Sequence, residues 1–571
     1  MQIVTPKQMS TIEENSEKIG VSRRQLMENA GKALAGLIDE YCRKNTSALP
    51  EEMSIVFLVG KGNNGGDGYA AANILVYRGY KITVISVCGQ PESELAKEMY
   101  LRLPRERITF IDGYRSKNVE AAIETAELNY KSNSDVSDIA ELEKKPNRNP
   151  IENILLKEKK RMVTVKNAIV AADVLIDCVY GTGFHGQLDR NTASMFSIGT
   201  SAYCISADVP SGGNCVSGTV SNGIFKADET LVFGYIKTGM TQFPLKRYCG
   251  KITIADIGIP KEAIAAIKDE RQYFRIERNH LAAFPPKRAI DAHKGIFGRV
   301  LFIGGSSSMR GAAAFAALGA LRCGAGLVSV ASVEKCIDTV SVLVPESTFV
   351  ELKSDSSGFI SFSSNREKLL EAMNKADSIV LGCGMGVTQD TIELTEFVAE
   401  NAKCPVIIDA DGINCISNNI DILVKKGSDI IITPHAGEMA RILGCETGFI
   451  LENRIIAAEK YAEKYGITVV LKGAGTIVAN NRCTAVNHTG NPGMSVGGSG
   501  DILAGMIGSI IAQGCEIFDS ACAGVYMHGL AGDSAAEKLG MEAMLPRDIL
   551  DNLSDSFRIL KEKHSWMSGR S

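Results

Sequence analysis

Short runs of apolar residues, each ending in a glycine or acidic turn, recur along the whole chain. In the first half they predict strands at residues 54–59, 81–87, 168–176, 202–207 and 251–257. A glycine-rich loop at 60–68 precedes a predicted helix at 69–77, and residues 8–41 predict two further helices, the second with Ser22 as its N-cap. Strand, glycine loop, helix and strand in this order form one turn of a doubly wound α/β sheet.

The second half, from about Phe274, repeats the pattern. Residues 311–321 are almost entirely Ala, Gly and Leu, which predicts a buried helix that lies close to the sheet and to a ligand. Residues 502–511 carry apolar side chains at the spacing of one buried helix face. Strands are predicted at 299–303, 378–381, 406–408, 430–432 and 468–471. Because each strand ends in a polar or glycine turn, we expect a mostly parallel sheet with its site along one edge.

With 571 residues the chain is too long for one core, since single cores stop growing near roughly 250–300 residues. We therefore predict two α/β domains, at 1–265 and 275–565. A net charge of −4 gives no basis for nucleic-acid or membrane binding, and no apolar run is long enough to cross a bilayer. The 15 scattered cysteines and the lack of a signal peptide predict a cytoplasmic protein. The charged segment 129–161 is expected to be a partly disordered or helical surface insertion without chemistry.

Three glycines within four residues precede the helix predicted at 502–511. Free backbone N–H groups and the positive end of the helix dipole favour a phosphate there. Asp501 stands where the loop becomes the helix, so its carboxylate could take the proton of a hydroxyl that is being phosphorylated. A simple N-cap is the alternative interpretation. The predicted phosphate ligands are Lys472, with the backbone of Gly473, Ala474, Gly475, Thr476, Gly497, Gly498, Ser499 and Gly500.

Other polar side chains follow the neighbouring strands of the second half. Asp409 and Asp411 come after one strand, and His435 and Glu438 after the next. Asp409 could merely cap a turn, and a lone loop histidine is more often a satisfied cap than a ligand. Beside three carboxylates, however, we expect His435 to contact substrate, and Glu438 or His435 to contact a phosphate-bound Mg²⁺.

In the first half, Asn63, Asn64 and Asp67 lie within the glycine loop, and Asp177 and Asp208 stand at the ends of the next two strands. Amide and carboxylate oxygens on tight loops are hard ligands that suit an alkali or alkaline-earth cation. The alternative is that Asn and Asp only tolerate the dihedral angles of the turn. Three such loops along one sheet edge favour a functional site.

Residues 1–260 closely resemble the NAD(P)H-hydrate epimerase family, through Leu26–Gly31, Gly62–Gly68, Asp177–Gly183 and Asp208–Gly212. The resemblance implies a Rossmann-like α/β/α sandwich that interconverts the R and S forms at the hydrated C6 of the nicotinamide ring, with Asp208 and Asp177 as the catalytic carboxylates. It implies a K⁺ ion held by Asn64, Asp177 and Ser211. The implied hydrate pocket consists of Asn63, Asn64, Gly65, Gly66, Asp67, Gly181, Thr182, Gly183, Phe184, His185, Gly186, Gln187 and Asp208.

Residues 275–560 resemble the ADP/ATP-dependent NAD(P)H-hydrate dehydratases, which have a ribokinase-like fold, through His293–Gly295, Gly324–Val328, Asp409–Asp411, Thr433–Met439 and Asn491–Asp501. Cys383-Gly384-Met385-Gly386 and Gly412 are mild departures, from a usual Pro-Gly-Leu-Gly and a common Ala. The resemblance implies Mg²⁺ with ADP or ATP, and Asp501 as the base that activates the C6 hydroxyl. The residues implied at the substrate are Ala312, Gly386, His435 and Asp501.

Together the resemblances imply the repair of hydrated NADH and NADPH, both epimers being converted through the S-hydrate and a phosphorylated intermediate. We also expect a homo-oligomer. The main alternative is a ribokinase-like kinase of another small alcohol with an accessory nucleotide-binding domain, which would leave the first half unexplained. A non-enzymatic nucleotide-binding protein is a further alternative, disfavoured by the presence of Asp501 and its glycine loop.

Overall fold

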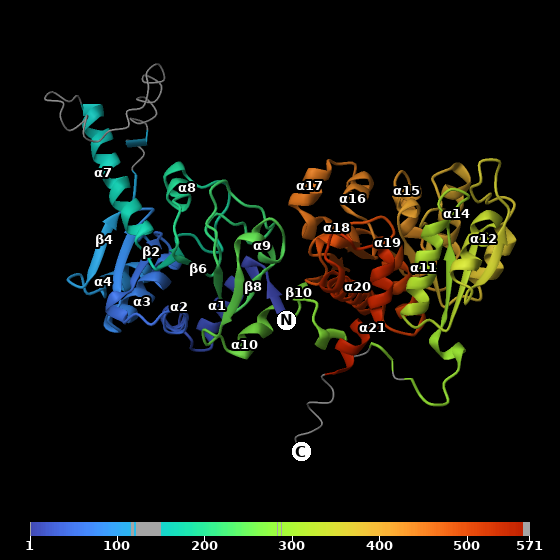
Figure 1. The fold of residues 1–571 in the computed structure, drawn as a ribbon, viewed down its shortest axis with the longest axis horizontal. Coiled ribbons are helices and arrows are strands. Elements are labelled where there is room, and N and C mark those ends of the chain that lie inside the picture. Colours follow the sequence, from blue (N-terminus) through green and yellow to red (C-terminus); the bar gives the residue numbers. More distant parts are fainter. Residues whose placement is uncertain (1, 116–118, 121–149, 282–283, 287, 563–571) are drawn as a thin grey trace. The chain divides into compact units, whose positions relative to one another are not determined.

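The computed structural model describes residues 2–115, 119–120, 150–281, 284–286 and 288–562 (Figure 1). The chain forms two compact units, one of Ile3–Asp269 and one that begins at Glu270. Within the described residues, no helix combines the length and apolar character that a membrane span needs.

The N-terminal unit is built on a sheet of seven strands in the order β4-β3-β2-β5-β6-β7-β9. Every neighbouring pair in it is parallel. The sheet strands are β2 (Ser54–Val59), β3 (Lys81–Ser86), β4 (Ile108–Asp112), β5 (Val174–Cys178), β6 (Tyr203–Ala207), β7 (Glu229–Phe233) and β9 (Lys251–Ala255). Strands β5 and β7 are buried along their whole length, as expected for a sheet covered on both faces. This all-parallel order confirms the predicted doubly wound α/β class.

Helices cover this sheet on both sides, and a short parallel pair of strands, β1 (Gln2–Val4) and β8 (Ile236–Lys237), lies apart from it. The helices are α1 (Pro6–Lys18), α2 (Arg23–Asn45), α3 (Asn63–Tyr77), α4 (Glu94–Leu101), α7 (Pro150–Val170), α8 (Arg190–Phe196), α9 (Leu245–Tyr248) and α10 (Lys261–Ile264). The hydroxyl of Ser22 accepts a hydrogen bond from Gln25 N–H, which confirms the predicted cap of α2.

Two sequence predictions in this unit are wrong. The glycine loop expected at 60–68 becomes helical at Asn63, because its glycines serve close packing: a Cβ on Gly65 would lie 2.2 Å from Gly60 O. The strand expected at 168–176 begins only at Val174, and residues 168–170 end helix α7.

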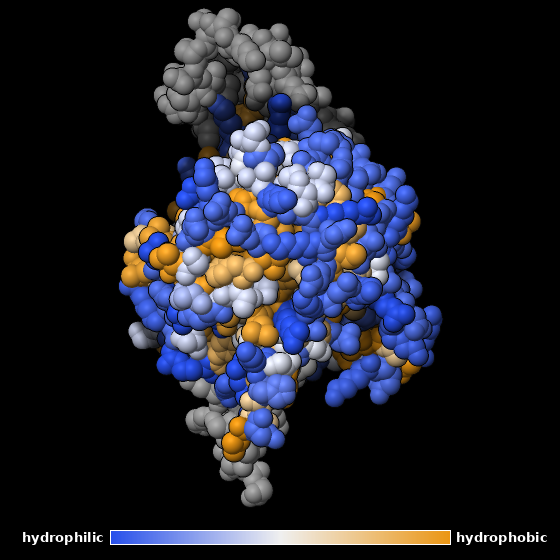
Figure 2. Space-filling model, turned by 90° about the vertical axis from the view of Figure 1, so that its right-hand side faces the viewer, coloured by the Kyte–Doolittle hydropathy of each residue, from blue (hydrophilic) through white to orange (hydrophobic). Residues whose placement is uncertain are grey.

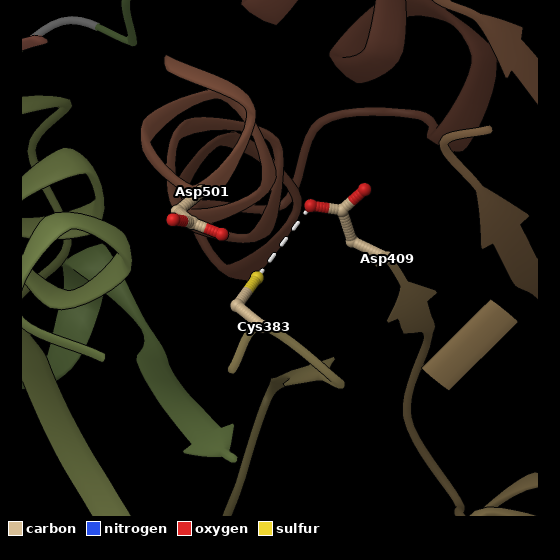
Figure 3. A group of neighbouring side chains, drawn as sticks. All are labelled: Cys383, Asp409 and Asp501. Atoms are coloured by element: carbon tan, nitrogen blue, oxygen red, sulfur yellow. Dashed lines mark hydrogen bonds between the residues drawn. The ribbon is translucent and has the colours of Figure 1, made fainter. Parts of the chain in front are cut away.

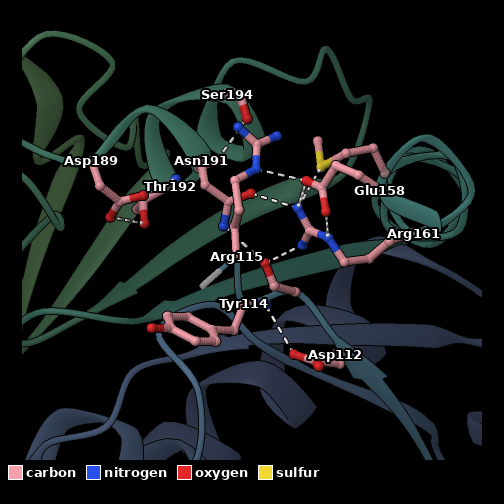
Figure 4. Close-up of polar contacts among 11 residues, drawn as sticks. Asp112, Tyr114, Arg115, Glu158, Arg161, Asp189, Asn191, Thr192 and Ser194 are labelled. Atoms are coloured by element: carbon pink, nitrogen blue, oxygen red, sulfur yellow. Dashed lines mark hydrogen bonds and ion pairs between the residues drawn. The ribbon is translucent and has the colours of Figure 1, made fainter. Parts of the chain in front are cut away.

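Helix α7 contains the only part of the predicted insertion that lies within the described residues, 150–161. It is not purely a surface element, because Arg161 donates to Gly113 O, to Glu158 and to Asn191 Oδ1, the last at 2.7 Å. Arg115 donates to Glu158 Oε1 at 2.7 Å, and the Glu158 side chain is 10% exposed (Figure 4). This buried network ties α7 to the end of β4 and to α8.

The C-terminal unit contains a second sheet, in the order β13-β12-β11-β14-β15-β16-β17-β18-β19-β10. Its strands are β10 (Gln272–Arg275), β11 (Arg299–Ile303), β12 (Leu327–Val333), β13 (Thr348–Leu352), β14 (Ser378–Leu381), β15 (Val406–Ile408), β16 (Ile430–Ile432), β17 (Thr468–Leu471), β18 (Ile477–Ala479) and β19 (Cys483–Val486). Only β18 is antiparallel to its neighbours, which confirms the mostly parallel sheet.

The helices of this unit are α11 (Arg310–Arg322), α12 (Glu334–Leu343), α13 (Arg366–Met373), α14 (Gln389–Asn401), α15 (Asp411–Ile416), α16 (Ala436–Leu443), α17 (Thr447–Glu452), α18 (Arg454–Tyr465), α19 (Ser499–Ala512), α20 (Ile517–Leu539) and α21 (Pro546–Glu562). The chain also has 3₁₀ turns at Pro50–Glu52, Thr238–Thr241, Ala265–Ile267, Arg278–Leu281, Lys294–Phe297, Ile420–Lys425 and Pro492–Met494. The face turned to the viewer in Figure 2 is mostly hydrophilic, with separate hydrophobic patches across its middle.

Helices α11 and α19 approach each other closely because both carry glycine at the contact. A Cβ on Gly505 would lie 2.0 Å from Ala316 O, and one on Gly319 would lie 2.5 Å from Ile502 O. The predicted buried helices at 311–321 and 502–511 are therefore confirmed, and their small residues fix the position of the α19 N-terminus.

Candidate active sites

A cavity of about 670 Å³ opens at the carboxyl edge of the N-terminal sheet. Of the predicted pocket residues, it is lined by Asn63, Asn64, Asp67, Gly181, Thr182, Gly183, Phe184, His185, Gln187 and Asp208. Gly65, Gly66 and Gly186 are not among the lining residues; Gly66 lies against Met27, where a Cβ would be 2.7 Å from its sulfur.

Asp208 follows strand β6 in a left-handed backbone conformation, with φ of 65°. Its Oδ1 accepts a hydrogen bond from Phe233 N–H at 3.1 Å and an ion pair from Lys237 Nζ. The Lys237 side chain is 1% exposed and lies at the end of β8. Sequence analysis did not find Lys237, because a single lysine after a short apolar run carries no signal of its own.

Two more carboxyl groups, Glu13 on α1 and Asp67 on α3, line the same cavity. Burial raises the pKa of Asp67 well above its ordinary value, and the negative charges of Asp208 and Glu13 add to the rise. Burial likewise raises the pKa of Glu13, with Asp208 again contributing. The protonated form is thus favoured more than usual at both groups, whereas Asp208 is paired with a lysine.

Asp177 lies beneath the cavity with no solvent exposure. Its carboxylate accepts four hydrogen bonds: Ser211 N–H at 2.8 Å, Ser211 Oγ at 2.6 Å, Ser206 Oγ at 2.9 Å and Val179 N–H at 3.2 Å. Burial raises the pKa of Asp177 to about 6, and these hydrogen bonds work against the rise. Asp177 thus joins two strand-end loops, and its catalytic role stays a prediction.

The predicted K⁺ ligands are near neighbours in this structure. Ser211 Oγ lies 3.1 Å from Tyr180 O and donates to Asp177, and the Asn64 side chain lies beside Gly181. The buried Asn64 Nδ2 has no hydrogen-bond partner among the described residues. Amide, carbonyl and hydroxyl oxygens suit an alkali cation, whereas both Asp177 oxygens are already engaged. The donor set fits K⁺ by its chemistry, and ligation by Asp177 stays a prediction.

In the C-terminal unit, Asp409 follows β15 and is 1% exposed. Its Oδ1 accepts hydrogen bonds from Lys472 Nζ and Thr433 Oγ1, both at 2.6 Å. Lys472 also faces the start of α19, since a Cβ on Gly500 would lie 3.3 Å from its ammonium. Lys472, which is predicted to bind phosphate, therefore lies beside the helix start that is predicted to bind the same anion.

Asp501 lies in the first turn of α19, beside Asp409 and Cys383 (Figure 3). Burial raises its pKa to about 7; Asp409 adds to the rise, while Cys383 and Lys472 oppose it. The Cys383 thiol is buried and donates to Asp409 Oδ2 at 3.5 Å. Ligand atoms of the three side chains lie within 4.8 Å of one another, and the Lys472 ammonium bonds the other Asp409 oxygen, Oδ1.

The remaining predicted residues surround this centre. Gly386 N–H donates to Asp411 Oδ2 at 2.9 Å. Ala312 Cβ on α11 lies beside Gly384, which is in the same loop as Gly386. His435 Nδ1 accepts hydrogen bonds from Gly437 and Glu438 N–H, so His435 caps α16, and its side chain is 58% exposed. Its contact with substrate stays a prediction.

Two residues that sequence analysis missed support the loops that are predicted to bind phosphate. The buried Arg454 donates to Ala474 O at 2.5 Å and to Leu471 O at 3.2 Å, which fixes the loop after β17. His528 Nε2 lies 3.4 Å from Ser499 Oγ, and burial lowers the pKa of His528 to about 4, so the ring is neutral beneath the helix start.

Comparisons with known proteins match both units. Residues 23–239 match the family model described as YjeF-related protein N-terminus, and residues 300–555 match the model described as NAD(P)H-hydrate dehydratase. The chain is 30% identical to the bifunctional NAD(P)H-hydrate repair enzyme of Moorella thermoacetica over 569 residues, 99% of this chain and 98% of that one. It is 30% identical to the enzyme of the same name from Escherichia coli, over 95% of this chain and 90% of that one.

One solved structure is a Bacillus subtilis ADP/ATP-dependent NAD(P)H-hydrate dehydratase co-crystallized with ATP/Mg²⁺. It is 26% identical with a TM-score of 0.43, covering 50% of this chain and 98% of that one.

Proposed function

Since this chain belongs to the family of bifunctional NAD(P)H-hydrate repair enzymes, we propose that its two sites divide the repair between them. The cavity of the N-terminal unit interconverts the R and S hydrates of NADH and NADPH. The C-terminal site removes water from the S-hydrate at the expense of ADP or ATP. We assign the activities to residues 1–265 and 275–565.

The observation that carries the dehydratase assignment is Asp501 in the first turn of α19, with a pKa raised to about 7. A carboxylate with this pKa is a suitable base near neutral pH. Asp501 takes the proton of the C6 hydroxyl, whose oxygen attacks the terminal phosphorus of the nucleotide. Lys472 and the N–H groups at the start of α19 stabilise the charge on the transferring phosphoryl group.

The phosphorylated hydrate then loses phosphate from C6 and a proton from C5, which restores the ring double bond. Mg²⁺ bound with the nucleotide supplies further charge neutralisation. Glu438 is the candidate to hold it, because its buried carboxylate stands at the start of α16. Carboxylate oxygens are the ligands that Mg²⁺ prefers.

For the epimerase, the hydrated nicotinamide ring occupies the 670 Å³ cavity beside Asp208. K⁺ bound by Asn64, Ser211 and the neighbouring loop oxygens would hold the 177–183 loop in place. Replacing K⁺ by a larger organic cation is expected to slow epimerisation and leave dehydration unchanged.

The test supplies a mixed R and S hydrate with Mg²⁺, K⁺ and either ADP or ATP, and follows the near-ultraviolet absorbance that intact NADH regains. Full recovery identifies the donor. Asp501→Asn is expected to abolish recovery while R and S still interconvert, as read by chromatography. If Asp501→Asn dehydrates as fast as the natural chain, the assignment of the base is wrong.

We also propose that the chain acts in the cytoplasm as a homo-oligomer. All 15 cysteines are free thiols, which suits a reducing compartment. Light scattering coupled to gel filtration measures the oligomeric state.

A further inference from the structure

In the cavity of the N-terminal unit, the carboxyl groups outnumber the cations that contact them. Glu13, Asp67 and Asp208 contribute three carboxyl groups, and Lys237 contributes the ammonium that contacts one of them. Of the other cations that line the cavity, Arg23 lies 3.6 Å from Glu14 and Glu17, and Lys61 lies 3.0 Å from Glu92. These two cations are therefore matched by carboxylates that do not line the cavity.

Lys237 is fixed on one carboxylate. Its ammonium bonds Asp208 Oδ1 and also donates to Phe233 O at 3.3 Å, so backbone and side chain hold it together. Phe233 N–H occupies the same Asp208 oxygen at 3.1 Å. The structure records no hydrogen bond to Asp208 Oδ2 from the described residues, which leaves this oxygen for a ligand in the cavity.

Asp67 is placed differently. It enters the cavity from α3, and no hydrogen bond to its carboxyl group is recorded among the described residues. With no cation in contact and the Asp208 charge nearby, the neutral acid is the favoured form, which agrees with the strongly raised pKa of Asp67. One cavity thus holds a carboxyl group in contact with a cation and another without such a contact.

We propose that Asp67 and Asp208 form an acid–base pair for epimerisation, in which Lys237 holds Asp208 as the carboxylate and Asp67 carries the proton. The inference rests on the proposed assignment of the epimerase to this cavity. It adds a second proton-transferring residue and a positioning residue to the site.

The step balances without any oxidant or reductant. Asp67 protonates the C6 hydroxyl, the C6–O bond breaks and water leaves, while the N1 lone pair forms the N1=C6 bond. Water adds to the other face of C6 and gives its proton to Asp208, and the N1=C6 electrons return to N1. One proton has moved from Asp67 to Asp208, and cavity water returns it. The opposite epimer uses the two groups in reverse.

The test measures R-to-S interconversion over pH, and incorporation of ¹⁸O from labelled water at C6. Asp67→Asn and Asp208→Asn are each expected to slow epimerisation about 100-fold or more. Asp67→Asn should also abolish the alkaline limb of the pH profile, and Asp208→Asn the acid limb. Lys237→Gln should move the acid limb to higher pH, a change that a merely structural role would not produce. Glu13, Arg23, Lys61 and His185 also face the cavity, so Glu13→Gln is measured as well.

Glu40→Gln, at an exposed position on α2 where Glu40 pairs with Lys44 and does not line the cavity, is the control and should change nothing. Equal loss in Glu13→Gln and none in Asp67→Asn would overturn the choice of acid. Epimerisation without ¹⁸O incorporation would overturn the step itself.

A last variant separates this inference from the cavity assignment. Gly183 lines the cavity, and a Cβ there would meet nothing within 4 Å, so Gly183→Leu is designed to add bulk at the cavity lining. If Gly183→Leu leaves epimerisation unchanged, the cavity is not the site. If it stops epimerisation but Asp67→Asn does not, only the acid–base pair is wrong.

Discussion

The proposed role of Asp501 as a base has a cost to the folded state. Its pKa is raised from 3.8 to about 7, so the folded chain holds this proton more tightly than the unfolded chain does. Unfolded Asp501 ionises near its ordinary pKa, whereas the folded group ionises only near 7. Stability therefore falls as pH rises through this window, and the loss is complete above pH 7.

The first prediction concerns activity and stability at this residue together. Dehydratase kcat/KM should rise about tenfold per pH unit below pH 7 and level off above it, because only the carboxylate is a base. Asp501→Asn should lose about 10²- to 10⁴-fold in dehydration and raise Tm at pH 8, since no buried charge forms. At pH 4 its Tm should match that of the natural chain. An equal Tm difference at both pH values would contradict the charge argument.

A second prediction concerns Cys383, whose thiol contacts Asp409 and lowers the pKa of Asp501. Cys383→Ala should move the acid limb of the dehydratase profile to higher pH, whereas Cys383→Ser keeps a donor and should move it less. Cys404→Ala removes a buried thiol elsewhere in the unit and serves as the control. An unmoved limb in Cys383→Ala would show that the thiol has no electrostatic role.

Among single residues, sequence reasoning found those that stand at the ends of helices and strands. Asp208, Asp409 and Asp501 follow strands or begin a helix. The structure places Asp208 at the N-terminal cavity and Asp409 beside Asp501, and their roles stay predictions. Lys237 was missed because its partner lies 29 positions away, and His528 because it is 29 positions from Ser499 and lies in a continuous buried stretch of α20. Such pairs exist only once the fold has formed.

Among the elements, helices α11 and α19 carry the dehydratase site through their contact. Gly505 and Gly319 allow the backbones to approach, and this approach positions the first turn of α19. The contact has no room for a methyl group, because a Cβ on Gly505 would clash with a backbone oxygen that cannot rotate away.

The third prediction compares two glycines of these helices. Gly505→Ala should destabilise the C-terminal unit by about 1–3 kcal/mol through overpacking. Gly311→Ala has nothing within 4 Å, so it should stabilise by about 0.4–1 kcal/mol through reduced entropy of the unfolded chain. Residual dehydratase activity after heating reports on this unit. Equal thermal resistance of the two variants would show that the close contact does not limit stability.

About half of the strands of both sheets could be predicted, because buried parallel strands are continuous apolar runs with clear turn signals. The strands that were not predicted are β4, β7, β10, β12, β13, β18 and β19. The run at 168–176 failed because an apolar helix end followed by a strand has no periodicity that separates them. The start of α3 failed because glycine indicates both a loop and a close contact, and only the neighbouring backbone at Gly60 decides between them.

For the whole molecule, each unit has its own core and its own site. We expect the hydrates to exchange freely with solvent between the two activities.

The fourth prediction follows from this independence. Asp501→Asn alone should restore no NADH, and Asp208→Asn alone should stall at the S share of the mixture. An equimolar mixture of the two variants should restore NADH completely, read by the recovered absorbance. A mixture that stalls at the S share would show that the hydrate passes between sites of one chain.

Because both units are on one chain, the cell synthesises them in equal numbers. Each translation event delivers one epimerase and one dehydratase, so a change in expression scales both by the same factor. The ratio of epimerase units to dehydratase units is then fixed at one to one by the chain itself. No separate regulation is needed to keep the two activities in proportion.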